Sequence, residues 1–536
     1  MNRRSSYQVS ARQGRPVASG AWKVAVVASI AAWIGACLAP DAQQGKTPGA
    51  TASSGGTPGA TGSGAGAGGG GQGGAGGGGG ASSLVSAVWL NPYGNGSVQS
   101  ARVMTADAEG NAIVAGVYAY EEIMTGGMML PAANEEDTFV AKLSPDGAVL
   151  WSRNIGGAGN QTVNGVAVDP KDGSIVLAGG FTQSLDTKEC GVLASAGGTD
   201  VFVVKLDPTT GACAWSRAFG DGADQLALGL AVGEDQGAVL TGTFAGTLDF
   251  GGATMPLVPN AGPAVNGNTE IFVAKLDQAG QALLSRTIGD PPYDLNQASL
   301  GIAVDSSNDV LITGTFEGAL LVTGEPIFNE GPPDLFLGKL TGSSLLSQWC
   351  LTSGDGASYQ YSRSVAVGPS KNIVFAGFYT GDVKLGDKVI EAGPDVDIFV
   401  AAVSPDGQPL WGKRVGGIGA QYALDVALDS DQSILLSGAF SGVLDFSDAG
   451  GGDDPLVGSD VMAGTSVDAF VARLSPEGDR IWSFQGRGPD SQSARAVAPA
   501  PNGAYVAGWF QNMATFGTLP ASSLGQEDIY ILKLED

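Results

Sequence analysis

A unit of about 65 residues is repeated seven times between Leu84 and Asp536, and this repetition constrains the fold more than any other feature. Four positions recur in every copy. The first is an aromatic residue within a D-x-F-V-A-K-L pattern: Phe139, Phe202, Phe272, Phe336, Phe399, Phe470 and Tyr530. The second is a tryptophan, replaced once by leucine: Trp89, Trp151, Trp215, Leu284, Trp349, Trp411 and Trp482. The third is a glutamine: Gln99, Gln161, Gln225, Gln297, Gln360, Gln421 and Gln492. The fourth is a glycine two residues before an aromatic: Gly116, Gly179, Gly242, Gly314, Gly377, Gly438 and Gly508.

Each copy reads as four strands. In the second copy these are GVAVD, IVLAGGF, VFVVKL and AWSRAFG, separated by turns such as PKDGS and DPTTG. β-Branched and aromatic residues bounded by Asp-Gly and Pro-Asp clusters are typical of strands and hairpins, and helical periodicity is missing. Four-stranded units repeated around an axis form a β-propeller. The sequence therefore predicts an all-β fold, a seven-bladed propeller of four-stranded antiparallel blades.

The two ends of the repeat region indicate how the ring closes. The segment SLVSAVWLNPYG, residues 83–94, matches the fourth strand of a unit, whereas the final DIYILKLED matches the third. The last copy thus lacks a fourth strand that the first segment can supply. Pairing the two removes the exposed edges of an open sheet. We expect the N-terminal strand to complete the seventh blade.

The repeat motifs GVAVDPKDGSIVLAGGF (Gly165 to Phe181) and TGTFAGTLDFGG (Thr241 to Gly252) resemble the bacterial surface β-propeller repeat called SBBP, a relative of NHL-type blades. The resemblance covers Leu84 to Asp536. It implies a module for binding or surface display. A shared fold does not fix a function, so the expectation for function is coarser than that for fold.

The N-terminus has the features of an export signal. The first 36 residues carry five basic and no acidic residues and end in the apolar run Val24 to Ala36. That run is shorter than the roughly 20 residues of a membrane-spanning helix. IGAC, Ile34 to Cys37, resembles the lipobox of bacterial lipoproteins, which implies lipidation of Cys37. The alternative is an ordinary cleavage site with an incidental cysteine.

A lipid on Cys37 would make the membrane a partner. Leu38, rather than Asp, follows the cysteine, which in lipoproteins generally favours the outer membrane. Ala42 to Ser83 is almost entirely Gly, Ala, Ser, Thr, Gln and Pro and cannot build a core, so we expect a disordered tether. The expected organisation is a signal peptide over 1–36, the lipidated cysteine and tether over 37–83, and the propeller over 84–536, exported and anchored in the cell envelope.

Composition excludes several classes of function. The chain has no histidine, which excludes Ser-His-Asp and Cys-His catalysis and His-ligated zinc. Its 53 acidic residues exceed its 27 basic ones, for a net charge of −26. Such a charge disfavours nucleic acid as a partner, because phosphate binding needs a basic surface. We expect a monomer that is not an enzyme.

Residues present in every copy are better explained by blade geometry than by one active site. An acid begins the third strand of each copy: Asp137, Asp200, Glu270, Asp334, Asp397, Asp468 and Asp528. The seven glutamines would make either a ring of ligand-binding amides at the channel mouth or ties to the backbone, and we favour the ties because buried amides must be paired. The tryptophans are expected to pack between blades.

Binding residues are expected where the copies differ. The connection between second and third strands is longest in the third and sixth copies, and the crossing at GDPPYDLNQ, Gly289 to Gln297, is also extended. These segments emerge on one variable face, and VKLGDKVI, Val383 to Ile390, predicts an ordered extra hairpin there. The candidate ligand contacts are Tyr293, Asp294, Asp453 and Asp454. Clustered carboxylates also suit Ca²⁺, but no twelve-residue calcium loop is present, so no cofactor is predicted.

Three interpretations follow. The favoured one is a non-enzymatic binding or surface-display module for a protein or a glycan. The alternatives are a glycan-active enzyme with a carboxylate pair on the variable face, and a structural protein of the envelope.

Besides Cys37, the chain contains three cysteines, which allow at most one internal disulfide. Cys213 and Cys350 fall in repeated strands, so buried thiols are the favoured interpretation for them, with Cys190 the third.

Overall fold

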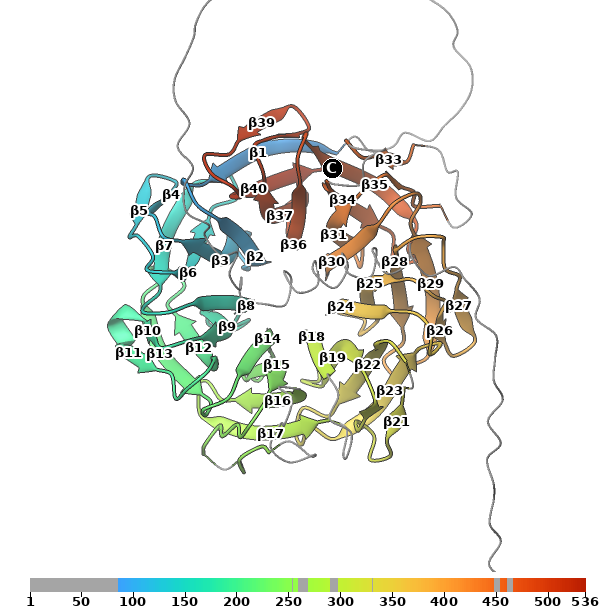
Figure 1. Ribbon diagram of the computed structural model, residues 1–536, viewed down its shortest axis with the longest axis horizontal. Coiled ribbons are helices and arrows are strands. Elements are labelled where there is room, and N and C mark those ends of the chain that lie inside the picture. The colour runs from blue at the N-terminus through green and yellow to red at the C-terminus, as the bar shows by residue number, and fades with distance from the viewer. Residues whose placement is uncertain are drawn as a thin grey trace, which may run out of the picture. The chain divides into compact units, whose positions relative to one another are not determined.

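A computed structural model describes residues 85–252, 254–258, 269–289, 297–329, 331–447, 454–459 and 466–536. Within these ranges the chain is all-β apart from the three-residue 3-10 turn η1 (Lys188–Cys190). Seven antiparallel sheets are arranged around a central axis, each contributing its first strand to the inside (Figure 1). The predicted seven-bladed propeller is confirmed. The predictions for Cys37 and for the tether concern residues outside the described ranges.

The four main strands of blades 1 to 6 follow one another along the chain, interrupted only by extra hairpins. Blade 1 contains β2 (Gln99–Ala106), β3 (Ala112–Ala119), β6 (Glu136–Leu143) and β7 (Val149–Ile155). Blade 2 contains β8 (Gln161–Val168), β9 (Ile175–Phe181), β12 (Asp200–Leu206) and β13 (Cys213–Phe219). Blade 3 contains β14 (Gln225–Val232), β15 (Ala238–Phe244), β16 (Glu270–Leu276) and β17 (Ala282–Ile288). Blade 4 contains β18 (Gln297–Val304), β19 (Val310–Phe316), β22 (Asp334–Leu340) and β23 (Ser347–Ser353). Blade 5 contains β24 (Gln360–Val367), β25 (Ile373–Tyr379), β28 (Asp397–Val403) and β29 (Pro409–Val415). Blade 6 contains β30 (Gln421–Leu428), β31 (Ile434–Phe440), β34 (Asp468–Leu474) and β35 (Arg480–Arg487).

The seventh blade joins the two ends of the propeller. It contains β36 (Gln492–Ala500), β37 (Gly503–Phe510), β40 (Asp528–Glu535) and, as outermost strand, β1 (Ser86–Tyr93). β1 pairs antiparallel with β40, placing Leu90 opposite Leu532 (Figure 1). The predicted closure by the N-terminal strand is confirmed.

Most blades carry a small hairpin between their second and third main strands. These hairpins are β4 (Ile123–Thr125) with β5 (Met128–Leu130), β10 (Ser184–Asp186) with β11 (Val192–Ala194), β20 (Ala319–Leu320) with β21 (Ile327–Phe328), β26 (Val383–Leu385) with β27 (Lys388–Ile390), β32 (Val443–Leu444) with β33 (Leu456–Val457), and β38 (Met513–Phe516) with β39 (Leu519–Ser522). The hairpin predicted at Val383 to Ile390 is confirmed. In the described part of this connection in blade 3, Leu248 forms an isolated bridge with Leu257. Much of the extra length in blades 3 and 6 lies outside the described residues.

The hydrophobic core lies between blades. One cluster packs Tyr118 and Phe139 of blade 1 against Tyr505 and Ile529 of blade 7, all of them buried. Each sheet therefore buries its faces only against its neighbours. This explains why the aromatic position of the repeat is filled in all seven copies.

The repeated tryptophans fasten each blade to the next. The indole N–H donates to a backbone carbonyl in the following blade's outer turn at 2.8–3.3 Å; the pairs are Trp89 to Pro145, Trp151 to Pro208, Trp215 to Gln278, Trp349 to Pro405, and Trp411 to Pro476. The ring lies on a turn glycine: a Cβ on Gly147 would meet Trp89 at 2.8 Å. Trp482 donates instead to the Asp536 side chain at 2.7 Å. The reason is that the third and fourth strands of blade 7, β40 and β1, are not joined by a turn.

The one substituted tryptophan is compensated in space. Leu284 replaces it in blade 3, and the facing turn of blade 4 carries Leu345, which has a positive φ of 55° and is buried. Both leucines pack in the same cluster. Leu345 thus fills the volume that an indole ring occupies between the other blades.

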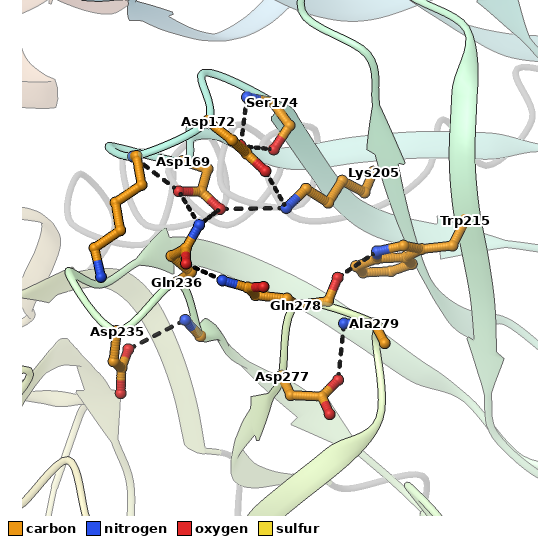
Figure 2. A network of polar contacts seen from close by, with 12 residues as sticks. Asp169, Asp172, Ser174, Lys205, Trp215, Asp235, Gln236, Asp277, Gln278 and Ala279 are labelled. Carbon is orange, nitrogen blue, oxygen red and sulfur yellow. Dashed lines mark hydrogen bonds and ion pairs between the residues drawn. The ribbon is translucent and has the colours of Figure 1, made fainter.

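The face bearing the short turns is cross-linked by ion pairs that the sequence did not reveal. In Figure 2, Lys205 of β12 contacts Asp169 and Asp172, each at 3.2 Å, and Gln236 from blade 3 donates to Asp169 at 3.4 Å. Equivalent pairs are Lys142 with Asp107, Lys275 with Asp235, Lys339 with Asp305, and Arg473 with Asp429. This face is therefore a structural network.

The interpretation of Cys213 as a buried thiol is wrong. Cys213 forms a disulfide with Cys190, whose η1 turn packs against β13. The bond joins the extra segment of blade 2 to the outer strand of that blade. Cys350 is free, and burial raises the pKa of its thiol to about 12.

Candidate functional site

The acids that begin the third strands are buried, with exposures of 0–7%. They hold the preceding loops: Asp200 accepts the Ala196 N–H at 2.5 Å, Asp397 that of Gly393 at 2.8 Å, and Asp528 that of Leu524 at 2.7 Å. Asx-type bonds of this kind stabilise turns. In these three blades the acid orders the variable face and does not point to a ligand.

Asp334 differs from these acids. It is 7% exposed, and no residue in the described part of the chain donates a hydrogen bond to it. Desolvation, followed by the nearby charge of Asp355, raises the pKa of Asp334 to about 7. Among the described residues of blade 4, Asp334 is therefore a buried carboxylate with no compensating partner.

We expect Asp334→Asn to stabilise the protein at pH 8 by about 2 kcal/mol. The folded-state pKa lies above the unfolded value, so the wild type is penalised above pH 7 and recovers stability as the pH falls through 7 toward 4. The advantage of the variant should shrink between pH 8 and pH 5 in urea unfolding curves. Asp397→Asn is the matched control and should destabilise, because Asp397 pairs with Arg414 at 2.7 Å. A pH-independent effect of Asp334→Asn would contradict the assignment.

The seven glutamines are also buried, at 0–1% exposure. Their amide N–H groups mostly donate to backbone carbonyls around the start of the inner strand. Gln161 donates to Gly159 at 3.0 Å and to Ser184 at 3.1 Å, and Gln360 to Asp382 at 2.9 Å. These bonds tie the crossing loop to the segment that follows the second strand of the same blade.

Of the predicted ligand contacts, Tyr293, Asp294 and Asp453 lie outside the described residues. Asp454 is exposed, with a φ of 68°, and its carbonyl accepts a hydrogen bond from Arg480 at 2.7 Å. Arg480 begins β35, the outer strand of blade 6. Asp454 therefore lies over the outer edge of the blade.

The inner strands each contain a β-bulge, where the register with the second strand shifts. Bulges redirect side chains and are common near functional sites. The bulged residues are Arg102, Asn164, Leu228, Leu300, Arg363, Leu424 and Arg495. Three arginines thus occupy one inner position of a strongly acidic chain. Arg102 donates to Thr162 of the next inner strand at 2.8 Å and pairs with Glu136 at 3.3 Å.

Asp425 is the only acid that directly follows a bulge. Its carboxylate accepts the Ser364 hydroxyl of blade 5 at 2.8 Å and the Val497 N–H of blade 7 at 3.0 Å. It therefore connects three successive inner strands around the axis. Desolvation raises its pKa to about 6 despite these hydrogen bonds and the charge of Arg363.

An aromatic cluster lies where the inner strands of blades 5 and 6 begin. Tyr359 and Tyr361 stack with centroids 6.4 Å apart and an interplanar angle of 5°. Tyr361 stacks on Phe378 at 5.2 Å, and Phe378 meets Tyr422 edge-on at 5.1 Å. Phe378 and Tyr422 are buried, whereas Tyr359 and Tyr361 are partly exposed.

This cluster breaks the sevenfold pattern. The residue before the glutamine is not aromatic in the other copies: Val98, Asn160, Asp224, Asn296, Ala420 and Ser491. The residue after it is aromatic only in blades 5 and 6; elsewhere it is Ser100, Thr162, Leu226, Ala298 or Ser493. We call Tyr359, Tyr361, Phe378, Tyr422, Arg363 and Asp425 the blade 5–6 site. Sequence reasoning missed it, although the differences between aligned copies would have revealed it.

The turn-face cavity between blades 6 and 7 is less suited to a ligand. Its volume is about 680 Å³, and it is lined by Asp429, Asp431, Arg473, Asn502 and Asp536 among others. Arg473 already pairs with all three of those aspartates. In the part of the chain that the structure describes, no group of three or more Cys, Asp or Glu residues is arranged to hold a metal ion.

No family model matches the chain. An uncharacterised WD repeat-containing protein, L264, of Acanthamoeba polyphaga mimivirus is 22% identical over 519 residues, covering 79% of this chain and 36% of the relative. The chain thus spans about a third of that relative's length. The chain is a seven-bladed β-propeller with WD-repeat and other propeller neighbours, and this fold is compatible with a binding or scaffold module.

Solved structures with similar folds include proteins of several different kinds. The WD40 β-propeller domain of Doa1 is 11% identical, with 83% of this chain and 96% of that chain covered and a TM-score of 0.38. A quinohemoprotein alcohol dehydrogenase from Comamonas testosteroni is 9% identical, with 84% and 76% covered and a TM-score of 0.41. XC5397 from Xanthomonas campestris, a gluconolactonase, is 12% identical, with 74% and 90% covered and a TM-score of 0.33. These similarities are too low to support any functional inference. Among the described residues, no helix has the length and apolar character needed to cross a membrane.

Proposed function

We propose that the propeller is the non-enzymatic binding module of an envelope lipoprotein, anchored through Cys37, and that its ligand is a glycan held at the blade 5–6 site. The observation that carries the proposal is the stacked pair Tyr359 and Tyr361, found at positions where the other copies have no aromatic pair.

The chemistry of the site suits a sugar. A tyrosine offers a flat apolar face and a hydroxyl group that exchanges hydrogen bonds, and ligand sites combine such faces with a few polar groups. Buried Phe378 stacks on Tyr361 and is itself packed edge-on against buried Tyr422, so the Tyr361 ring rests on a fixed support. Arg363 and Asp425 lie farther along the same two inner strands, two residues after Tyr361 and three residues after Tyr422.

Absence of turnover is part of the proposal. Without histidine, a glycan-active enzyme would need two carboxylates flanking the scissile bond. Asp425 supplies one carboxyl, and the charge acting on it is that of Arg363 rather than a second acid. A WD-repeat relative leaves a protein partner as the competing interpretation.

A glycan array with residues 84–536 tests the proposal. We expect saturable binding of at least one glycan, weakened about tenfold or more in Tyr359→Ala/Tyr361→Ala, since each lost stacking face costs on the order of 1 kcal/mol. Tyr120→Ala is the matched control, because Tyr120 is 64% exposed on blade 1, away from the site.

Three results would contradict the proposal. Binding that survives the double substitution would place the ligand elsewhere. Hydrolysis of a bound glycan that is lost in Asp425→Asn would establish the enzymatic alternative. A protein captured only by the wild type, with an empty array, would replace the glycan by a protein partner.

A further inference from the structure

The hairpin β4–β5 of blade 1 carries an unusual set of side chains. Of the eight methionines in the chain, three lie in its sequence IMTGGMML: Met124, Met128 and Met129. Met124 is 51% exposed and Met129 is 53% exposed. They do not fill a core, so packing leaves their presence unexplained.

The register of the hairpin places two of these thioethers together. Met124 lies directly opposite Met129 across the two strands. Residues opposite one another share a face of the sheet, with Cβ atoms roughly 4.5–5.5 Å apart. Each methionine side chain has three rotatable bonds, so the two sulfur atoms can approach one ion from the solvent side. Met128 occupies the other face, with its sulfur 3.7 Å from the Ser152 hydroxyl.

The base of the hairpin is fixed. Ile123 and Thr125 are fully buried, Leu130 is 5% exposed, and Thr125 donates to the Ser152 hydroxyl of β7 at 2.7 Å. The turn is closed by Gly126 and Gly127, with φ of 55° and 87°. The paired thioethers therefore stand on a rigid support, which lowers the entropy lost on binding.

We propose that Met124 and Met129 form a binding site for a monovalent soft metal ion, Cu(I), at the outer edge of blade 1. Thioether sulfur is a soft donor that favours Cu(I) over divalent ions such as Zn²⁺, Mg²⁺ or Ca²⁺.

Other soft donors in the described chain are less suited to such an ion. The whole chain has no histidine, and Cys190 and Cys213 are joined in a disulfide. Cys350 is kept as a thiol, because burial raises its pKa to about 12. Met513 on the hairpin of blade 7 is 62% exposed but lies opposite Ser522.

Blade 5 provides a matched hairpin without the donors. Its strands β26 and β27 pair Val383 with Ile390 as β4 and β5 pair Ile123 with Leu130, but Lys384 and Val389 stand where blade 1 has the two methionines. The same hairpin backbone thus occurs in blade 1 with two methionines and in blade 5 without them.

The test is a Cu(I) titration of the full chain under ascorbate without oxygen, followed by gel filtration and metal analysis. We expect the wild type to retain about one equivalent of copper more than Met124→Leu/Met129→Leu. The NMR signals of the Met124 and Met129 methyl groups should shift when copper binds. Leucine preserves the apolar volume, so the melting temperature should not change. Any copper held by Cys37 is common to both proteins and cancels in the difference.

Two further variants separate this site from general methionine exposure. Met513→Leu should retain as much copper as the wild type. Lys384→Met/Val389→Met, placed in the Met124→Leu/Met129→Leu background, should restore the lost equivalent. Equal copper retention by the wild type and Met124→Leu/Met129→Leu would overturn the proposal. Displacement of the bound copper from the wild type by an equal concentration of Zn²⁺ would also overturn it.

Discussion

Deleting residues 85–94 should lower the free energy of unfolding by about 5–10 kcal/mol, the largest effect we expect from any local change. The deletion removes β1 and exposes the edge of β40. It also eliminates two hydrogen bonds to blade 1, from the Trp89 indole N–H to the Pro145 carbonyl at 3.1 Å and from the Asn91 side-chain amide to the Gly147 carbonyl at 2.7 Å. Trp89 also packs against the cluster between blades 7 and 1. Urea and thermal unfolding of the propeller give the measurement.

Deleting residues 42–83 instead is the matched control, and the midpoint of unfolding should then stay unchanged. A synthetic peptide of residues 84–94 added to the shortened propeller should raise its melting temperature in proportion to the logarithm of peptide concentration. Equal stability of the two deletions would show that closure by β1 does not hold the ring together.

Asp305→Ala should destabilise the protein by about 3–5 kcal/mol, because it leaves the buried Lys339 ammonium without its main partner. The two groups are 2.8 Å apart, with side-chain exposures of 6% for Lys339 and 1% for Asp305. Asp305 also accepts the Ser307 N–H at 2.8 Å, so its loss loosens the turn. Chemical denaturation of single and double variants forms a double-mutant cycle.

Blade 5 supplies the control for this cycle. Gly368 and Ala402 occupy the positions equivalent to Asp305 and Lys339, so this blade has lost both partners together. The double variant Asp305→Ala/Lys339→Ala should therefore cost less than Asp305→Ala alone. Asp387→Ala, which breaks an exposed pair with Lys388, should change stability by no more than about 0.5 kcal/mol. A double variant less stable than Asp305→Ala would contradict the burial penalty.

The candidate site was much harder to predict than the fold. A residue type that occurs at the same position in all seven copies indicates a role in blade geometry. The structure confirms this for Asp397 and Gln161, which are buried and hydrogen-bonded to backbone groups. A site built once has no such redundancy. Tyr361 and Asp425 belong to different copies, and only the packing of inner strands brings their blades together.

The sequence predicts ligand contacts in the longest connections, because loop length can be read directly from a sequence. The predicted contacts are Tyr293, Asp294, Asp453 and Asp454. Asp454, the one that the structure describes, lies at the outer edge of blade 6. The β-bulge that redirects Arg363 and its equivalents cannot be recognised from the alternation of hydrophobic and polar residues alone.

The sequence by itself determined the number of blades, the four strands of each and the closure by the N-terminal strand. These follow from local chemistry: strand and turn propensities repeated in register, and a missing strand at one end that matches a spare strand at the other. Only the tertiary structure decided which residues of different blades meet. The Cys190–Cys213 disulfide, the compensation of Leu284 by Leu345, and the tyrosines at the blade 5–6 site all depend on it. Such contacts join positions far apart in the repeat, and their geometry is set by how sheets pack around the axis rather than by any residue's immediate neighbours.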